Sequence, residues 1–420
     1  MEQEFESLKH LFQQEFTKMV AVISKLFGLQ HIEMAEDIVS ETFLQASETW
    51  GVKGVPANPT AWLYTVAKHK TLYQFRRNKI FDNKVAPEWV AQAKDQEYVE
   101  PDFSKENIKD SQLQMLFAVC NPAIASEAQI GLALRILCGF GIDEIADAFL
   151  SNKETINKRL FRAKEKLRTE NVTMELPGVT EIASRLDNVL HIIYLLFAEG
   201  YYSKTQDQIL RKDLCVEAMR LGLMLTAYAP TNQPHTNALM ALMCFHASRF
   251  TARQTGEASY VLYEQQDEQL WDQDLIRQGN YFLGLSAQGH EVSSYHLEAR
   301  IAYWHCVKED TPEKWEEILA LYDHLLQVNY SPSVALNRAF ALFKVKGPQA
   351  ALAETETLKL EDNHFYFVLL GELYKNIDCQ KAKTHLQKAH ALAKTQTEKQ
   401  VIQGKIDALE KLPGNHHTLR

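Results

Sequence analysis

The stretch from Gly139 to Arg168, GFGIDEIADAFLSNKETINKRLFRAKEKLR, limits the possible folds more than any other part of the chain. In its first half, apolar residues recur on one helical face: Ile142, Ile145, Ala146 and Phe149. After a break at Leu150-Ser151-Asn152, a second helix carries its own apolar stripe of Ile156, Leu160, Ala163 and Leu167. Two short amphipathic helices with a tight turn between them predict a helix-turn-helix.

The second helix of this pair is strongly basic. Between Lys153 and Arg168 there are seven positive and two negative side chains, a formal charge of +5, whereas the whole chain carries −9. Asn157, Lys158, Phe161 and Arg162 lie opposite the apolar stripe, where Asn and Arg can read base edges and Lys can hold phosphates. The helix alone leaves two interpretations open, a DNA-reading helix and an ordinary amphipathic helix with a solvated basic face.

Composition narrows the class of protein. The 420 residues suffice for two to four domains, and with 46% hydrophobic and 24% charged residues the chain is typical of a globular protein. Pro and Gly are sparse, at 12 and 17, which disfavours all-β and disordered classes. We find no membrane-spanning run and no signal peptide, and the six cysteines are scattered without CxxC pairs. We therefore expect a cytoplasmic, all-α protein without a metal or cofactor.

Three helices are predicted before the linker, at about Phe5–Phe27, Ile32–Trp50 and Pro59–Arg77. The second has a polar face with Glu36, Asp37, Ser40, Glu41 and Gln45. Asn58 is a good N-cap for the third, because Pro59 follows it at the first helical position. An acidic stretch with Pro87 and Pro101 then predicts a linker over residues 81–110 with at most a short helix. Helix is expected to resume at Ser111.

The order of these segments resembles the extracytoplasmic-function sigma factors of bacterial RNA polymerase. The segments that carry the resemblance are AEDIVSETFLQA at Ala35–Ala46, NPTAWLYTVAKHKTLYQFRR at Asn58–Arg77 and the helix-turn-helix. The resemblance covers about residues 5–170 and implies two small helical domains. These are a sigma domain two over 1–80, which binds core polymerase and the −10 promoter element, and a sigma domain four over 111–172, which binds the −35 element.

The resemblance also implies roles for single residues. Asp37, Ser40 and Glu41 would face the clamp of the largest polymerase subunit, with Ser40 standing where the family usually has Gln. The implied −10 contacts are Lys53, Asn58, Lys68, Lys70, Arg76 and Arg77. The implied −35 contacts are Thr155, Asn157, Lys158, Arg159 and Arg162. Trp62 could serve as a stacking platform, but its spacing with Leu63 and Val66 favours a place in the core.

The second half of the chain extends beyond a typical member of that family. Leu176-Pro177-Gly178 predicts a boundary, and amphipathic helices follow over 178–412. From Pro312 onward, small residues recur and helix starts repeat near the tetratricopeptide period of about 34 residues. Arg185–Tyr202 and Leu262–Ile276 resemble one subgroup of these sigma factors, which carries a fused helical-repeat domain. This resemblance implies a regulatory domain.

The sequence therefore predicts a sigma factor whose partners are core RNA polymerase and promoter DNA. A protein or small-molecule signal on the repeat domain stays open, and we expect neither membrane association nor enzymatic activity. Tyr263, Glu264, Asp267, Trp271 and Asp272 form an acidic-aromatic cluster, which we interpret as capping and packing residues rather than a catalytic site. The alternative is a helix-turn-helix regulator with a sensory repeat domain that binds DNA without acting as a sigma subunit.

Overall fold

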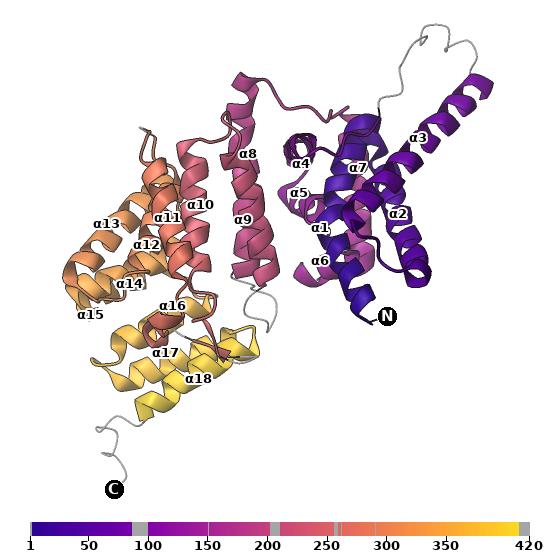
Figure 1. Cartoon of the computed structure of the whole chain (residues 1–420). Coiled ribbons are helices and arrows are strands. Elements are labelled where there is room, and N and C mark those ends of the chain that lie inside the picture. Colours follow the sequence, from indigo (N-terminus) through magenta and orange to yellow (C-terminus); the bar gives the residue numbers. More distant parts are fainter. Residues whose placement is uncertain are drawn as a thin grey trace. The chain divides into compact units, whose positions relative to one another are not determined.

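The structure of the protein is a computed structural model that describes residues 2–85, 100–149, 151–201, 211–255, 259–261, 263–289 and 291–410. Within these ranges the chain is helical apart from one pair of two-residue strands, β1 (Gln254–Thr255) and β2 (Ser259–Tyr260) (Figure 1). The prediction of an all-α protein with a large helical C-terminal region is confirmed. None of the described helices is both long and apolar enough to cross a membrane.

The chain divides into two compact units, Met1–Leu195 and Leu196–Arg420. We describe each unit by itself. The first contains the segments that resemble sigma domains, and the second contains most of the C-terminal helices.

The first unit begins with α1 (Glu2–Phe27), the short turn η1 (Leu29–His31), α2 (Ile32–Lys53) and α3 (Pro59–Val85). Glycines with positive φ end the first two long helices, Gly28 at +84° and Gly54 at +80°. The α2 helix packs against both α1 and α3. Its core face carries buried apolar side chains, including Ile38, Phe43 and Trp50.

The remaining helices of this unit are α4 (Lys105–Val119), α5 (Ser126–Leu132), a π-helical turn η3 (Ala133–Leu137), α6 (Ile142–Ala148), α7 (Lys153–Thr169) and the first part of α8 (Val179–Tyr201). The four apolar side chains of the predicted stripe on α7 are buried: Ile156, Leu160, Ala163 and Leu167.

The predicted linker over residues 81–110 is too long. The α3 helix continues to Val85, and α4 begins at Lys105 rather than near Ser111. Ser104 caps α4 by accepting a hydrogen bond from the Asn107 amide, and α4 packs on α1. The middle of the predicted linker, residues 86–99 with Pro87 and several acidic side chains, lies outside the described residues.

The compact units also divide at a different place from the predicted boundary at residue 178. The division falls inside α8, because the first half of this helix is hydrogen-bonded to the first unit. Arg185 Nη2 donates to the carbonyl of Phe117 at 2.5 Å, and Asn188 Nδ2 donates to that of Cys120 at 2.7 Å. Most of α8, which follows the predicted boundary, therefore belongs to the first unit. The limits of the functional domains stay a prediction.

The second unit is organised around α10 (Pro234–Ala247), in which nearly every residue is buried. The α10 helix packs against α9 (Lys212–Thr226), α11 (Gln273–Ser286) and α12 (Ser294–Trp304). Two short 3-10 turns, η4 (Tyr263–Gln265) and η5 (Glu268–Leu270), precede α11.

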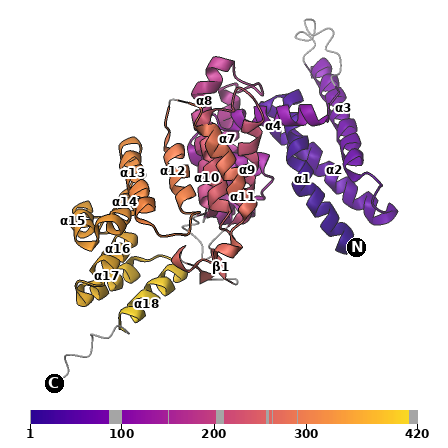
Figure 2. The same ribbon diagram turned by 60° about the vertical axis from the view of Figure 1, so that its left-hand side comes forward.

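Six more helices follow one another in this unit: α13 (Pro312–Val328), α14 (Pro332–Lys346), α15 (Pro348–Leu358), α16 (His364–Tyr374), α17 (Cys379–Leu392) and α18 (Gln396–Glu410). Each packs on the next, and Figures 1 and 2 show this succession from two directions. Buried alanines lie where the helices meet, for example Ala339, Ala351 and Ala382. The tetratricopeptide-like description stays an interpretation of this arrangement.

Candidate polymerase-binding and nucleic-acid interfaces

One face of α2 presents the residues predicted to bind polymerase. Asp37, Ser40 and Glu41 are all exposed, and they lie on the side opposite the buried Ile38 and Val39. One turn later on the same side, Leu44 is 60% exposed. In an interface, Leu44 would supply an apolar contact, and the two carboxylates would favour a partner of opposite charge.

The residues predicted to contact the −10 element are spread over the end of α2 and along α3. Lys53, Arg76 and Arg77 are exposed, and none of the three forms an ion pair within the part of the chain that the structure describes. Lys68 forms an ion pair with Glu100, and Lys70 Nζ lies 3.2 Å from Oε2 of Glu41. The Glu41–Lys70 pair therefore joins a predicted polymerase contact to a predicted DNA contact.

Asn58 has a structural task at the start of α3. Its side-chain oxygen accepts a hydrogen bond from the Ala61 amide at 3.0 Å, as expected of an N-cap. The side-chain amino group of Asn58 and the second lone pair of its oxygen could still contact DNA.

Two aromatic residues of α3 differ in exposure. Trp62 is half-buried and packs edge-on against the buried Trp50, with 5.4 Å between ring centroids. This contact agrees with the interpretation of Trp62 as a packing residue. Tyr73 is 66% exposed and lies one turn from Lys70 and from Arg76, so it is the aromatic ring on this basic face. The sequence analysis missed it, although its place between the cations was a usable signal.

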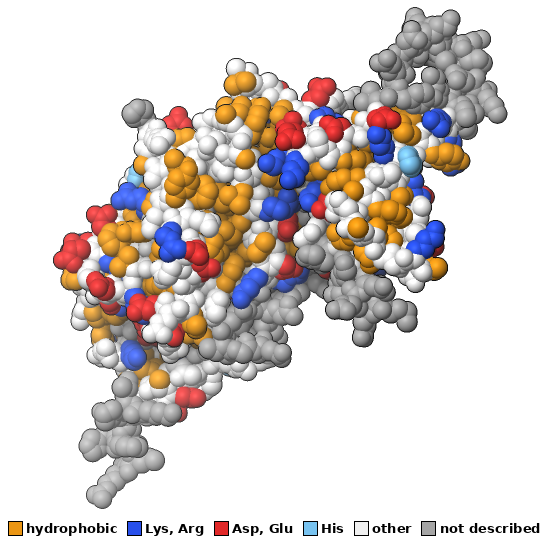
Figure 3. Space-filling view, in the orientation of Figure 1, with side chains coloured by type: hydrophobic (Ala, Val, Ile, Leu, Met, Phe, Trp, Pro, Cys, Tyr) orange, Lys and Arg blue, Asp and Glu red, His pale blue; other side chains and the backbone are white. Residues whose placement is uncertain are grey.

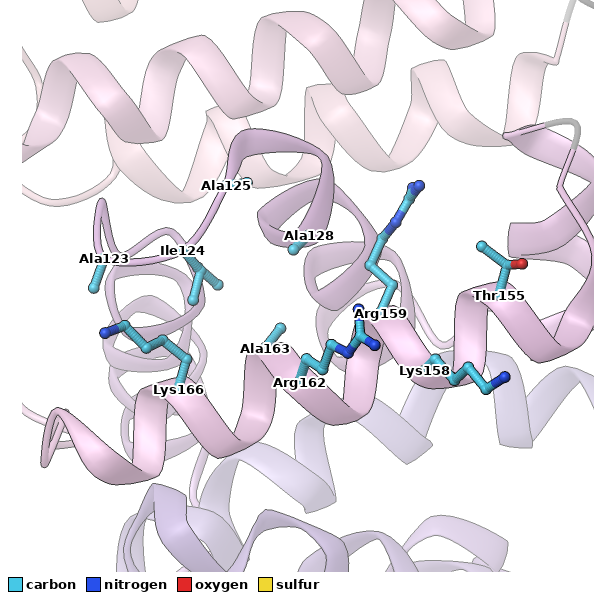
Figure 4. Close-up of a pocket in the computed structure, with 10 residues that line it drawn as sticks. All are labelled: Ala123, Ile124, Ala125, Ala128, Thr155, Lys158, Arg159, Arg162, Ala163 and Lys166. Carbon is cyan, nitrogen blue, oxygen red and sulfur yellow. The ribbon is translucent and has the colours of Figure 1, made fainter.

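A shallow groove runs along α7 (Figure 4). Four cations of α7 line it, Lys158, Arg159, Arg162 and Lys166, and its other wall comes from the turn before α5 and the start of α5. Thr155 closes one end. A groove with four cations and few carboxylates attracts a phosphate backbone.

The cations of this groove differ in how far they are already engaged. Arg159 lies 3.2 Å from Glu127, and Lys158 lies 2.6 Å from Glu154. Arg162 is exposed and has no ion pair with a described residue. Arg162 is therefore the side chain in the groove that is best prepared to contact a base or a phosphate.

The five predicted −35 contacts do not form one surface. Thr155, Lys158, Arg159 and Arg162 line the groove, whereas Asn157 faces a second hollow on the other side of α7. That hollow is shared with Phe161 and Lys164 of α7, with Arg135 of the π-helical turn, and with two carboxylates of α2, Glu33 and Glu36.

Glu36 lines this second hollow and is only 8% exposed. Its carboxylate accepts from Lys164 Nζ at 2.7 Å and from Arg135 Nε at 3.2 Å. The prediction that grouped Glu36 with Asp37, Ser40 and Glu41 on the polar face of α2 is therefore wrong, because its side chain is buried. The physical reason is that two cations distant in sequence approach α2 and neutralise a carboxylate that would otherwise need water.

The acidic-aromatic cluster of the second unit performs capping. Asp267 accepts from the Gln269 amide at 2.9 Å, and Asp272 accepts from the amides of Asp274 and Leu275 at 2.9 and 3.0 Å. These bonds support the structural interpretation of the two carboxylates. In the described residues, no group of three or more His, Cys, Asp or Glu side chains could hold a metal ion.

Comparison with known proteins finds two family models that match separate segments of the chain. Residues 11–80 match Sigma-70 region 2, and residues 185–287 match DUF6596, a family of unknown function. Among curated proteins, Uncharacterized protein R00370 of Rhizobium meliloti (strain 1021) is 33% identical over 391 residues, which cover 91% of this chain and 92% of the relative. No solved structure matches.

The region 2 match includes α2 and most of α3, the two helices that carry the acidic face and the −10 candidates. It supports a sigma-factor-like role in transcription initiation. On the extent of the shared sequence, the chain belongs to the same family as Uncharacterized protein R00370, and it carries a Sigma-70 region 2 domain at its N-terminal end.

Proposed function

We propose that this protein is a sigma factor that binds bacterial core RNA polymerase through α2 and directs initiation at specific promoters. The observation that carries the proposal is the exposed face of Asp37, Ser40 and Glu41 inside the Sigma-70 region 2 match. The clamp of the largest subunit is the partner that this face would bind, as the resemblance to extracytoplasmic-function sigma factors implies.

Two basic surfaces support the DNA part of the proposal. The first is the exposed side of α3 with Arg76, Arg77 and Tyr73, where cations could hold a single strand and a ring could stack on an unpaired base. The second is the groove along α7, where Arg162 is available. With a net charge of −9, the whole chain would bind DNA weakly by itself, so polymerase binding would bring these surfaces to the promoter.

The contact around Glu36 makes opening of the first unit part of the proposed mechanism. It joins α7, which would read the −35 element, to α2 of the region that would act at the −10 element. Promoter elements one or two helical turns apart are separated by about 35 Å or more. We propose that the Glu36–Lys164 ion pair separates when both elements are bound.

The C-terminal unit is proposed to modulate these steps, and α8 is the element through which it would act. This helix is continuous across the division between the units and is fixed to the first by Arg185 and Asn188. The double variant Arg185→Gln, Asn188→Leu should therefore change promoter activity, whereas Ser184→Ala on the exposed side of the same helix should not. Equal activity of the unchanged protein, the double variant and Ser184→Ala would show that α8 does not transmit the effect of the C-terminal unit.

The test of polymerase binding is co-elution of the full chain with purified bacterial core RNA polymerase in gel filtration. The unchanged protein should co-elute, and the variant Asp37→Arg, Glu41→Arg should not. The matched control is Glu106→Arg, Asp110→Arg, which makes the same charge change at the same spacing on exposed positions of α4, outside the region 2 match. If the first variant co-elutes as well as the control, α2 is not the binding face.

The competing function is that of a helix-turn-helix regulator, and the same purified protein can be used to distinguish the two functions. Such a regulator would bind a specific DNA duplex tightly without polymerase. A protein that does not co-elute with core polymerase but retains one duplex from a random pool at physiological salt would contradict the sigma proposal.

A further inference from the structure

In the second unit, three cations surround the ring of Tyr263. The distances from the ring centroid are 5.3 Å to the guanidinium carbon of Arg249, 5.3 Å to Lys308 Nζ and 5.4 Å to Lys314 Nζ. Trp271 stacks on the same ring at 6.3 Å between centroids. We call Arg249, Tyr263, Trp271, Lys308 and Lys314 the Tyr263 cluster.

Two of the three cations of the Tyr263 cluster are buried. Arg249 is 8% exposed and Lys314 is 1% exposed. The side-chain amines of Lys308 and Lys314 donate to backbone carbonyls, at 2.8 Å to Gln266 and at 2.6 Å to Val307. These carbonyls and the ring of Tyr263 supply partial negative charge, but they do not neutralise the cations.

No described carboxylate forms an ion pair with Arg249, Lys308 or Lys314. Asp310 is nearby, and its two oxygens accept from Trp315 Nε1 and from Lys344 Nζ. Asp310 also acts electrostatically on Lys314, and Asp310 and Glu268 both act on Tyr263. The three cations outnumber these two carboxylates, one of which is shared with Lys344, so the Tyr263 cluster keeps an excess of positive charge.

The hydroxyl of Tyr263 and the ring of His305 carry no negative charge. Burial raises the pKa of Tyr263 to about 12, so its hydroxyl stays protonated at neutral pH. Burial, together with Arg249 and Lys314, lowers the pKa of His305 to about 3, so its ring is uncharged.

Two buried donors at this position have no acceptor among the described residues. They are Nε of Arg249 and Nε1 of Trp271, and the Trp271 side chain is only 5% exposed. Buried donors are rarely left without an acceptor, because each costs about 1–3 kcal/mol of desolvation free energy. Oε1 of Gln266, an acceptor in the neighbouring turn, also has no partner among the described residues. The two donors still call for a group that accepts hydrogen bonds, and the surrounding cations favour a negatively charged one.

We propose that the Tyr263 cluster binds a small oxyanion, the phosphate or carboxylate group of a small molecule, through Arg249 Nε and Trp271 Nε1. Lys308 and Lys314 supply positive potential to the same site. This inference does not depend on the sigma proposal, since it concerns residues of the second unit alone. If both hold, the site would give the C-terminal unit a ligand to which it could respond.

The experiment is equilibrium dialysis of the full chain against radiolabelled inorganic phosphate at constant ionic strength, with labelled malonate in a parallel arm. We expect saturable binding of one of the two anions, and the arm that binds identifies the chemistry of the group. Arg249→Gln should weaken binding about tenfold or more, the effect of losing a charge-assisted hydrogen bond. Arg300→Gln is the matched control, because Arg300 is an exposed arginine of the same unit.

A second variant keeps the test decisive if Arg249→Gln does not fold. Trp271→Phe keeps a stacking ring, although a smaller one, and removes the donor, so it should weaken binding while circular dichroism stays unchanged. Absence of saturable binding in both arms would overturn the proposal. So would equal binding by the unchanged protein, Trp271→Phe and Arg300→Gln, since that pattern indicates anions held elsewhere on the surface. On the face that Figure 3 shows, charged side chains of both signs are scattered over the second unit.

Discussion

The Nζ atom of Lys164 lies 2.7 Å from Oε2 of Glu36, and this ion pair joins the basic helix α7 to the polymerase-binding candidate α2. Arg135 holds the other carboxylate oxygen at 3.2 Å. The pair is largely buried, with side-chain exposures of 16% for Lys164 and 10% for Glu36, so water screens it only weakly. Removing one partner of such a pair leaves a poorly solvated charge and is more costly than breaking a surface pair.

Neutralising Lys164 should loosen the contact between α7 and α2. We expect Lys164→Met to increase amide hydrogen exchange in η1, the start of α2 and the middle of α7, because Glu36 then keeps only Arg135. Lys158→Met is the control, since Lys158 is exposed on the same helix and, among the described residues, pairs only with Glu154. Exchange mass spectrometry on the full chain makes the comparison. Identical protection in both variants would mean that the ion pair does not hold the two helices together.

Arg162 should matter only on promoters that have an upstream element. A side chain that reads a base contributes about 1–3 kcal/mol, so Arg162→Ala should lower transcription from such promoters about tenfold. Promoters without the element should be nearly unaffected. Arg168→Ala provides the comparison, because Arg168 is exposed in the last turn of α7 and lies outside the groove. An equal loss on both promoter types would contradict base reading by Arg162.

Packing in the C-terminal unit can be tested at two helical glycines. A Cβ atom on Gly371 would lie 2.7 Å from Cγ of Leu386, where α16 meets α17, so Gly371→Ala should destabilise the unit by about 1–3 kcal/mol. A Cβ atom on Gly404 in α18 would meet nothing within 4 Å, and Gly404→Ala should be neutral or stabilising by up to about 1 kcal/mol. Urea unfolding monitored by circular dichroism measures both. Equal effects would contradict the close α16–α17 contact.

The C-terminal unit should lose stability as the pH falls below about 6.5. The pKa of His305 is about 3 in the folded protein and about 6.5 when unperturbed, so between these values the unfolded chain binds a proton that the folded chain does not. This difference costs about 2 kcal/mol between pH 7 and pH 5. His305→Gln should flatten the profile in urea unfolding at the two pH values, although His246, whose pKa burial also lowers, keeps part of the slope. An unchanged slope would show that His305 does not titrate in this way.

Most helices could be predicted because their signals are local. Apolar residues recur at helical spacing, and starts such as Thr311-Pro312 and Ser331-Pro332 combine an N-cap with proline at the first helical position. The start of α4 was missed for the opposite reason. Acidic residues and Pro101 surround it, and its cap, Ser104, is recognised only from its hydrogen bond to the Asn107 amide.

The site could be predicted only in part, because its contacts join distant segments. Exposure of Asp37, Ser40 and Glu41 follows from the helical period of α2. The burial of Glu36 cannot be predicted from the helical period, because it depends on Lys164, which is far away in sequence. In the same way, Asn157 shares its helix with Arg162 but faces a different hollow. The Tyr263 cluster draws its cations from separate segments after α10, after α12 and in α13, which no local pattern connects.

The central claim, that this protein directs promoter-specific initiation, is tested most directly by transcription in vitro from a random-sequence DNA pool. Core RNA polymerase is incubated with the pool, with and without the full chain, and the 5′ ends of the transcripts are sequenced. We predict that the protein produces transcripts that start at a fixed distance downstream of two shared sequence elements. Transcripts that are no more abundant and no more sequence-specific than those of core polymerase alone would contradict the sigma-factor account.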